Sequence, residues 1–252
     1  MPWFCVMITA VALLVGGPAS ASLLQVAVAS NFSATARLLA RDFTRETGHL
    51  VRLSTGSTGG LYAQITQGAP YDLYLAADQT RPAQAVQAGL ALAGTQVTYA
   101  IGRLVLFKPA ATGQITPDHL ITDDIATLAL ANPRTAPYGA AALQALEALS
   151  LTDLIRDKLV YGQTIAQTYQ FVAGGAADAG FVAWSQVREQ SAASVWLVPS
   201  GHHAPLAQDA VLLTRAQDNE AARAFWAYLT SVPGRSAIKA AGYDLPLAEA
   251  PR

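Results

Sequence analysis

The sequence predicts an α/β protein in which mainly parallel sheets are covered by helices on both faces. A unit of apolar strand, polar turn and helix recurs four times, and this alternation is typical of parallel sheets. Hydrophobic residues make up 52% of the 252 residues and charged residues 13%, so the chain can bury a core in one large or two modest domains. Gly102 interrupts a long apolar strand, at a point where the chain can leave one domain for another.

The first half of the chain supplies the first of these units. Residues 23–29 predict a short buried strand, and Ser30, Asn31 and Ser33 after it are all capable N-cap residues. The following helix has apolar residues at helical spacing and ends at Gly48. Further strands are expected at residues 49–53, 71–77 and 98–107, and helices at 61–67 and 83–88.

The second half repeats the pattern beyond a loop rich in Thr, Gly, Pro and Asp. The strand expected at residues 208–214 mirrors the one around Gly102 and predicts a return crossing between domains. The other strands are expected at 127–131, 159–161, 180–183 and 195–198, and helices at 140–149, 165–172, 185–189, from 218 onward, and from 235 to 241. We find no internal repeat, low-complexity tract or heptad pattern.

The amino terminus has the pattern of a signal peptide. Residues 3–17 are apolar and are followed by Ala19-Ser20-Ala21, which places small residues where signal peptidase reads them and predicts cleavage after Ala21. The n-region lacks Lys and Arg, so an uncleaved anchor is the alternative. The single cysteine, Cys5, lies in this segment, so the mature chain has no thiol for disulfides, metal binding or catalysis. We therefore expect an exported protein with residues 1–21 as its signal peptide.

The stretch from Thr55 to Gly60 (Thr-Gly-Ser-Thr-Gly-Gly) separates an apolar strand from a helix. Its glycines allow a tight turn, and Ser57 and Thr58 place hydroxyl groups at the helix start. The first N–H groups of a helix have no internal partner and lie at its positive end, so an oxyanion can bind there without Lys or Arg. An ordinary turn with a capping serine is the alternative.

Composition and motifs argue against several functions. The net charge is −1 and basic residues are scattered singly, which argues against nucleic-acid binding. The chain has no P-loop lysine, no dinucleotide fingerprint and no nucleophile elbow. Its four histidines lack the spacing of convergent metal ligands, and solvated loop positions are the simpler interpretation. Paired acid and base roles for Asp72, Asp78, Asp123 and Asp124 remain open, although surface and capping roles are favoured.

Two more residues at expected helix starts are candidate hydrogen-bond donors to a ligand. Tyr138 lies between Pro137 and Gly139, so its phenol is held rigidly and can donate a hydrogen bond, with a plain packing role as the alternative. Ile165 follows a polar turn, and because its side chain is inert, any binding role must come from its backbone N–H.

From Gln25 to Leu245 the chain resembles the periplasmic molybdate-binding proteins of ABC transport systems. The resemblance rests on six segments in order: residues 29–32 (Ala-Ser-Asn-Phe), 54–65, 68–78, 99–106, 136–139 (Ala-Pro-Tyr-Gly) and 177–183. It implies a two-domain clamshell of the second periplasmic-binding-protein type, with a tetrahedral oxyanion in the cleft. The expected domains are residues 22–101 with 206–252, and residues 102–205, joined by two chain crossovers.

The resemblance also implies which residues bind the anion. The family's first hydroxyl and its neighbour correspond to Ser30 and Asn31, its second turn to Ser57 and Thr58, and the far domain's contacts to Tyr138 and the backbone N–H of Ile165. Some members carry a ligand-contacting tyrosine where this chain has Ala183, so we expect no hydrogen bond to the ligand from Ala183. Thr58 stands where the family has serine, and its methyl group is expected to affect the size of the cavity.

The functional expectation is a non-enzymatic, periplasmic binding protein that captures molybdate or tungstate and delivers it to the membrane permease of an ABC transporter. The resemblance implies no cofactor, no direct metal ligand and no nucleic-acid partner, and a monomer is expected. Two alternatives stay open: the same fold binding sulfate or another tetrahedral oxyanion, and an exported enzyme acting on a phosphorylated or sulfated substrate.

Overall fold

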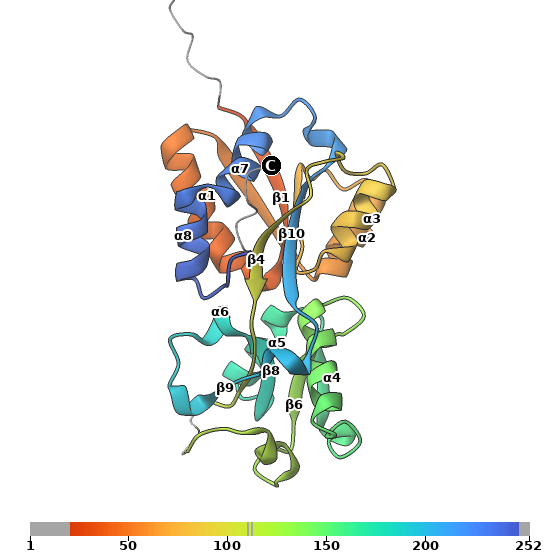
Figure 1. The fold of residues 1–252 in the computed structure, drawn as a ribbon, viewed down its shortest axis with the longest axis vertical. Helices are drawn as coiled ribbons and strands as arrows, with labels where there is room; N and C mark the ends of the chain where they lie inside the picture. The colour runs from red at the N-terminus through yellow and green to blue at the C-terminus, as the bar shows by residue number, and fades with distance from the viewer. Residues whose placement is uncertain (1–20, 110, 112, 247–252) are drawn as a thin grey trace, which may run out of the picture.

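The computed structural model describes residues 21–109, 111 and 113–246. Two five-stranded sheets lie end to end (Figure 1), with strand orders β2-β1-β3-β10-β4 and β7-β6-β8-β5-β9. We call the first sheet with the helices packed on it lobe I, and the second sheet with its helices lobe II. The predicted two-part α/β fold is confirmed.

Lobe I is built on a parallel core of three strands. Strand β1 pairs in parallel with β2 on one side and β3 on the other, while β10 runs antiparallel to both β3 and β4. Alternate side chains of β1 enter different cores: Val26 and Val28 pack on one face and Ala27 on the other. The strands are β1 (Leu23–Ala29), β2 (Leu50–Gly56), β3 (Leu73–Leu75), β4 (Val97–Gly102) and β10 (Leu206–Leu212).

Helices cover both faces of this sheet because each face is apolar. On one face α1 (Ser33–Thr47), α7 (Glu220–Thr230) and α8 (Val232–Ala240) contribute Phe43, Phe225 and Ile238 to one buried cluster. On the other face α2 (Thr58–Thr66) and α3 (Thr80–Gln87) contribute Leu61, Ile65 and Ala85 to a second cluster. Figure 1 shows α1, α7 and α8 on one side of the strands and α2 and α3 on the other.

Lobe II repeats this plan. Strand β6 pairs in parallel with β7 and β8, and β5 runs antiparallel to β8 and β9. Its strands are β5 (Leu104–Phe107), β6 (Leu128–Ala131), β7 (Leu159–Gly162), β8 (Ala179–Ala183) and β9 (Val195–Leu197), and its helices are α4 (Pro137–Ala148), α5 (Ile165–Ala173) and α6 (Trp184–Val187). Six short 3-10 turns are distributed over both lobes of the described chain: η1 (Ser30–Phe32), η2 (Pro117–Ile121), η3 (Arg156–Lys158), η4 (Ala192–Ser194), η5 (Ser200–His202) and η6 (Thr214–Ala216).

The chain crosses between the lobes twice, between β4 and β5 and again between β9 and β10 (Figure 1). The strand expected at residues 98–107 is interrupted at Gly102 as predicted, and its two parts, β4 and β5, lie in different sheets. Glycine is required at Gly102 by a close approach: a Cβ there would lie 2.0 Å from Tyr138 Oη and 2.8 Å from Gln208 Nε2. The domain boundaries given above, 22–101 with 206–252 and 102–205, stay a prediction.

Several element boundaries differ from the sequence prediction. The parallel cores are as expected, but each sheet also contains antiparallel pairs, because strands that return across the junction run against the others. Helix α3 begins at Thr80 rather than 83, where Asp78 Oδ1 accepts the N–H of Arg81 at 3.0 Å. The signal-peptide pattern at residues 1–21 falls almost wholly outside the described residues. Among those that are described, no helix is long and apolar enough to cross a membrane.

Candidate functional site

A small cavity lies between the lobes, just beyond the carboxyl ends of β1 and β2 in lobe I and at the starts of α4 and α5 in lobe II. Its volume is about 10 Å³, which is roughly what one small bound group needs. Clefts at the carboxyl ends of parallel strands are the usual ligand sites of open α/β sheets. The lining residues are Ala29, Ser30, Asn31, Gly56, Ser57, Thr58, Ala77, Ala136, Pro137, Tyr138 and Ile165. The structure thus brings all six sequence-predicted site residues to one cavity.

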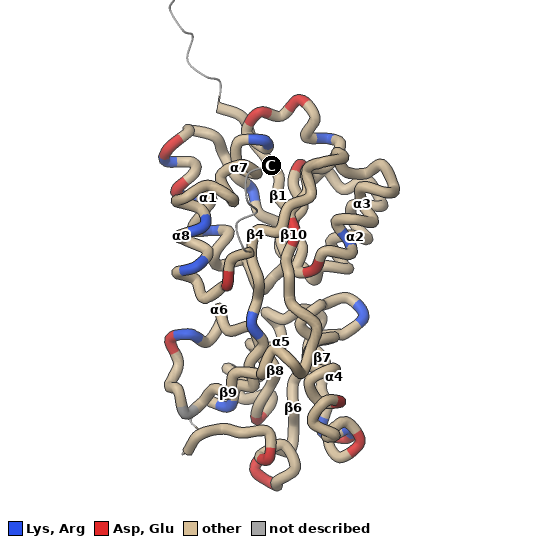
Figure 2. The backbone as a smooth tube through the Cα atoms, viewed as in Figure 1, with Lys and Arg blue, Asp and Glu red and all other residues tan. Residues whose placement is uncertain are grey.

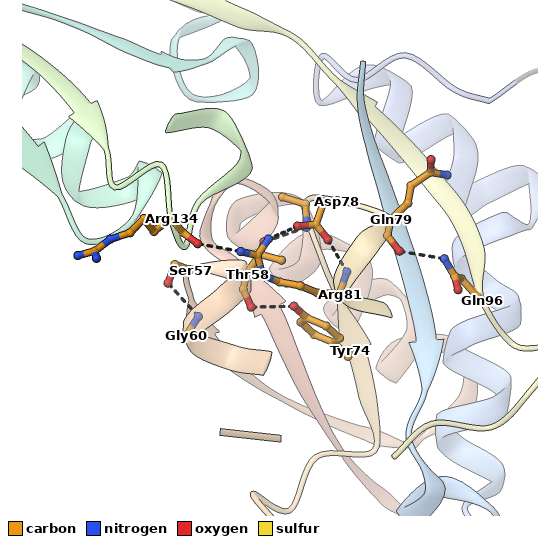
Figure 3. Close-up of polar contacts among 10 residues, drawn as sticks. Ser57, Thr58, Gly60, Tyr74, Asp78, Gln79, Arg81, Gln96 and Arg134 are labelled. Atoms are coloured by element: carbon orange, nitrogen blue, oxygen red, sulfur yellow. Dashed lines mark hydrogen bonds and ion pairs between the residues drawn. The ribbon is translucent and has the colours of Figure 1, made fainter. Parts of the chain in front are cut away.

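Thr58 is held through its carbonyl and its side-chain hydroxyl at the start of α2. Ser57 caps the helix by accepting the N–H of Gly60 at 3.2 Å, and the Tyr74 hydroxyl donates to the Thr58 carbonyl at 2.7 Å (Figure 3). The Thr58 side chain is buried, and its Oγ1 accepts the N–H of Ala77 at 3.0 Å. Because Oγ1 acts as the acceptor in this contact, its hydroxyl hydrogen remains available for donation.

Ser30 and Asn31 form the η1 turn that ends β1. Ser30 Oγ accepts the N–H of Ala166 in lobe II at 3.3 Å. Asn31 Nδ2 donates to Gln208 Oε1 at 2.8 Å and to Tyr243 Oη at 3.3 Å. Since a primary amide has two hydrogens, both are used inside the protein. What Asn31 can still offer to the cavity as a donor is its backbone N–H.

Lobe II contributes Tyr138 at the start of α4. Pro137 occupies the first turn of that helix, and Tyr138 is 1% exposed. Burial raises the pKa of the Tyr138 phenol well above 10.0, and the nearby Tyr243 adds to the rise, while hydrogen bonds with Gln208 and Asn31 lower it in part. The phenol therefore stays protonated at neutral pH and can act as a donor.

Ile165 is the first residue of α5. Thr164 caps this helix by accepting the N–H of Gln167 at 3.1 Å. Within the described chain the N–H of Ile165 donates to no protein acceptor, as is normal for a first helical residue. The Ile165 side chain packs into the lobe II core, so only its backbone is available to the cavity.

The electrostatics of the cavity come from neutral groups. None of the described residues that line it carries a formal charge. Figure 2 shows basic and acidic residues spread over both lobes. Four helix starts, at η1, α2, α4 and α5, meet at the cavity, and unpaired N–H groups at helix starts favour a bound anion.

Direct contacts close the two lobes over this cavity. The N–H of Gly59 donates to the Thr135 carbonyl at 2.8 Å, next to Thr58. Arg81 is held by the Asp78 carboxylate and donates to the Arg134 carbonyl at 2.9 Å (Figure 3). At another point Arg188 donates to the Ala240 carbonyl at 2.8 Å. Closure therefore links the lobes around the helix start that carries Thr58.

Sequence reasoning missed the buried polar residues behind the site. Gln208 is fully buried and contacts Asn31, Tyr99 and Tyr138, and Tyr243 contacts Asn31. The adjacent polar residues Gln208 and Asp209 in the otherwise apolar β10 were an available signal, because buried polar side chains need partners. The tyrosines gave no such signal, since aromatic residues also pack in ordinary cores.

The acidic and histidine residues that the structure describes form no cluster with the arrangement of a metal site. No group of three or more His, Cys, Asp or Glu side chains is placed to hold a metal ion in the part of the chain that is described. Asp72 accepts from the N–H of Gln25 at 2.7 Å and pairs with Arg215. Ala183 is buried, its N–H donates to Gln186 Oε1 at 3.0 Å, and it does not line the cavity.

Comparison with known proteins places this architecture in a family. The family model of the bacterial extracellular solute-binding proteins matches residues 24–244. The chain belongs to this family of extracellular solute-binding proteins. A curated relative, the molybdate-binding protein ModA of Azotobacter vinelandii, is 46% identical, with 90% of this chain and 92% of the relative covered. ModA of Rhodobacter capsulatus is 40% identical, covering 93% and 94%.

The solved structures agree on the fold of this solute-binding protein. The Azotobacter vinelandii periplasmic molybdate-binding protein superposes with a TM-score of 0.84 at 37% identity, covering 89% of this chain and 100% of that one. The sulfate-binding protein SubI of Mycobacterium tuberculosis superposes with a TM-score of 0.72 at 14% identity, covering 89% and 87%. At that identity the second match bears on the fold alone.

Proposed function

We propose that this solute-binding protein captures molybdate or tungstate between its lobes and delivers it to the membrane permease of an ABC importer. The observation that carries the proposal is the convergence of neutral donors from four helix starts, two in each lobe, on one small cavity. The naming of relatives at 46% and 40% identity as molybdate-binding proteins supports this choice of ligand.

In this proposal the oxyanion is held by donors alone. The hydroxyls of Ser30, Ser57, Thr58 and Tyr138 and the backbone N–H groups of Asn31 and Ile165 face it, with the Ser57 hydroxyl free to donate while its oxygen caps α2. A hydrogen bond to a charged group contributes about 1.5 to 3 kcal/mol. Several such bonds are enough for the roughly 8 kcal/mol of micromolar binding.

Closure of the lobes then explains both capture and delivery. Ligand donors come from both sides of the junction, so the bound anion favours the closed arrangement in which Gly59 contacts Thr135 and Arg81 contacts Arg134. The permease would receive the anion when the lobes separate. The protein would act as a monomer in the periplasm after removal of residues 1–21, without catalytic activity, cofactor or nucleic-acid partner.

Titration calorimetry of the mature protein tests the proposal. Molybdate and tungstate should bind with micromolar or tighter affinity and raise the melting temperature, and sulfate should compete weakly. No response to molybdate or tungstate would overturn the proposal, and tighter binding of sulfate would favour the sulfate alternative. Native mass spectrometry of protein purified from its own host should find one retained oxyanion and give its mass.

A further inference from the structure

Gln208 is a buried polar residue that does not itself line the cavity. It lies on β10, the strand that follows the second crossing, beside an irregularity in the pairing with β4. Its exposed fraction is 0%. Burying an amide is costly unless its donor and acceptor are both paired, so the partners of Gln208 carry information about its role.

The Gln208 amide joins three elements from both lobes. Its Oε1 accepts from Asn31 Nδ2 at 2.8 Å and from Tyr99 Oη at 3.2 Å. Its Nε2 donates to Tyr138 Oη at 3.3 Å. Asn31 and Tyr138 both line the cavity, one from each lobe. A single side chain thus sets the hydrogen-bond direction of two site residues.

The direction of the hydrogen bond from Gln208 has its largest consequence at Tyr138, because it decides whether the phenol can donate. A phenol oxygen can accept from one partner and donate its own hydrogen to another. Because Gln208 Nε2 donates to the phenol oxygen, the phenol hydrogen must point away from Gln208. Tyr138 lines the cavity, which is the open space towards which this hydrogen can point.

We propose that Gln208 is a positioning residue that turns the Tyr138 hydroxyl into a donor towards the cavity and thereby selects oxyanions without a proton. A protonated anion such as hydrogen phosphate carries an O–H that finds no acceptor among donors fixed in this way. This inference rests on the proposed function and names the feature that restricts its ligand class.

Gly102 has a related role in this arrangement. A Cβ at position 102 would lie 2.0 Å from Tyr138 Oη and 2.8 Å from Gln208 Nε2, so the crossing strand leaves room for this hydrogen bond. A methyl group there would displace the phenol, the nearer of the two, and would also crowd the amide of Gln208.

Three variants test the proposal by calorimetry with molybdate and inorganic phosphate at pH 8. Gln208→Met keeps the length of the side chain but removes both polar atoms, and we expect about tenfold weaker molybdate binding, the effect of one hydrogen bond. Gln208→Glu accepts from the phenol instead of donating to it. It should weaken molybdate binding about 100-fold or more and raise phosphate affinity relative to molybdate, because the phenol oxygen then faces the cavity as an acceptor. Gly102→Ala should weaken molybdate binding about tenfold with Gln208 intact.

The double variant with Tyr138→Phe separates positioning from a general structural role. Gln208→Met should change the affinity less than twofold in the Tyr138→Phe background, because its effect acts through the phenol. Equal losses in both backgrounds, or wild-type affinity in Gln208→Met, would overturn the proposal. If Gln208→Met does not fold, an unchanged phosphate-to-molybdate ratio in both Gln208→Glu and Gly102→Ala would overturn it. Failure of the wild-type protein to bind any tetrahedral oxyanion would instead overturn the proposed function.

Discussion

The starts of α2 and α5 are two helix ends of the same design that face one cavity from opposite lobes. Each is capped by a hydroxyl side chain, Ser57 in α2 and Thr164 in α5, and in each the first helical residue lines the cavity. In α2 that residue is Thr58, whose hydroxyl is oriented by Ala77. In α5 it is Ile165, which offers only a backbone N–H.

A ligand contact can therefore come from a side chain whose chemistry is visible in the sequence, as at Thr58, or from a backbone N–H that the side chain does not reveal, as at Ile165. A hydroxyl can be removed by a conservative substitution, whereas a backbone donor is insensitive to most substitutions at its position. If both helix ends bind the same anion, mutational scanning with alanine should detect Thr58 and overlook Ile165.

Replacing the Thr58 hydroxyl should have the largest effect. Thr58→Val keeps the shape of the side chain but removes one hydrogen bond to the anion and sets a methyl group against it, so molybdate affinity should fall about 100-fold. The N–H of Ala77 also loses its acceptor, so the melting temperature should fall. Calorimetry and thermal unfolding measure both.

Thr58→Ser is the matched control because it keeps the hydroxyl and removes only the methyl group. It should bind molybdate within a few-fold of the wild type, with a changed ratio of molybdate to sulfate affinity if the methyl group limits the cavity. Equal binding by Thr58→Val and Thr58→Ser would remove Thr58 from the ligand set.

Removing the backbone donor of Ile165 should have the next largest effect. Proline is tolerated at the first position of a helix, and Thr164 has an extended backbone (φ −139°, ψ 160°) that suits the residue before proline. Ile165→Pro should therefore retain α5 and lose the N–H, which weakens molybdate binding about 10- to 50-fold.

Ile165→Ala provides the control for this variant, since it loses more side-chain packing but keeps the N–H. It should be less stable than the wild type by about 2 to 5 kcal/mol and still bind molybdate with nearly wild-type affinity once folded. A large affinity loss in Ile165→Ala, or none in Ile165→Pro, would contradict the assignment of a backbone contact.

The smallest effect on affinity should come from pH in the neutral range. Burial raises the pKa of Tyr243 from 10.0 to about 12, and it also raises the pKa of Tyr99 and Tyr138 well above 10.0. Because the folded protein holds these protons more tightly than the unfolded chain, their stabilising effect is complete below about pH 10 and is lost as the pH rises towards 12.

Molybdate affinity at constant ionic strength should accordingly change little between pH 6 and 9, and the melting temperature should fall steeply above about pH 10. Tyr138→Phe removes one of the phenols and should reduce that alkaline fall. A marked loss of affinity between pH 7 and 9 would mean that the donor phenol ionises there and would contradict its burial.

Sequence determined much of this protein. The alternation of apolar strands and helices predicted the α/β class, and local signals such as Ser57 before Thr58 and Pro137 before Tyr138 marked helix starts, because capping depends on near neighbours in the chain. Motif resemblance then identified six residues that the fold brings to one cavity.

Tertiary structure decided what local signals do not contain. Only the fold shows that Gly102 lies against Tyr138, that the Asn31 amide is already used by Gln208 and Tyr243, and that Ala77 orients Thr58. The paired residues are far apart in the chain, so their contact depends on how the sheets pack and where the chain crosses between lobes. The direction of each hydrogen bond in the site follows from those distant partners, and the sequence around each residue leaves it open.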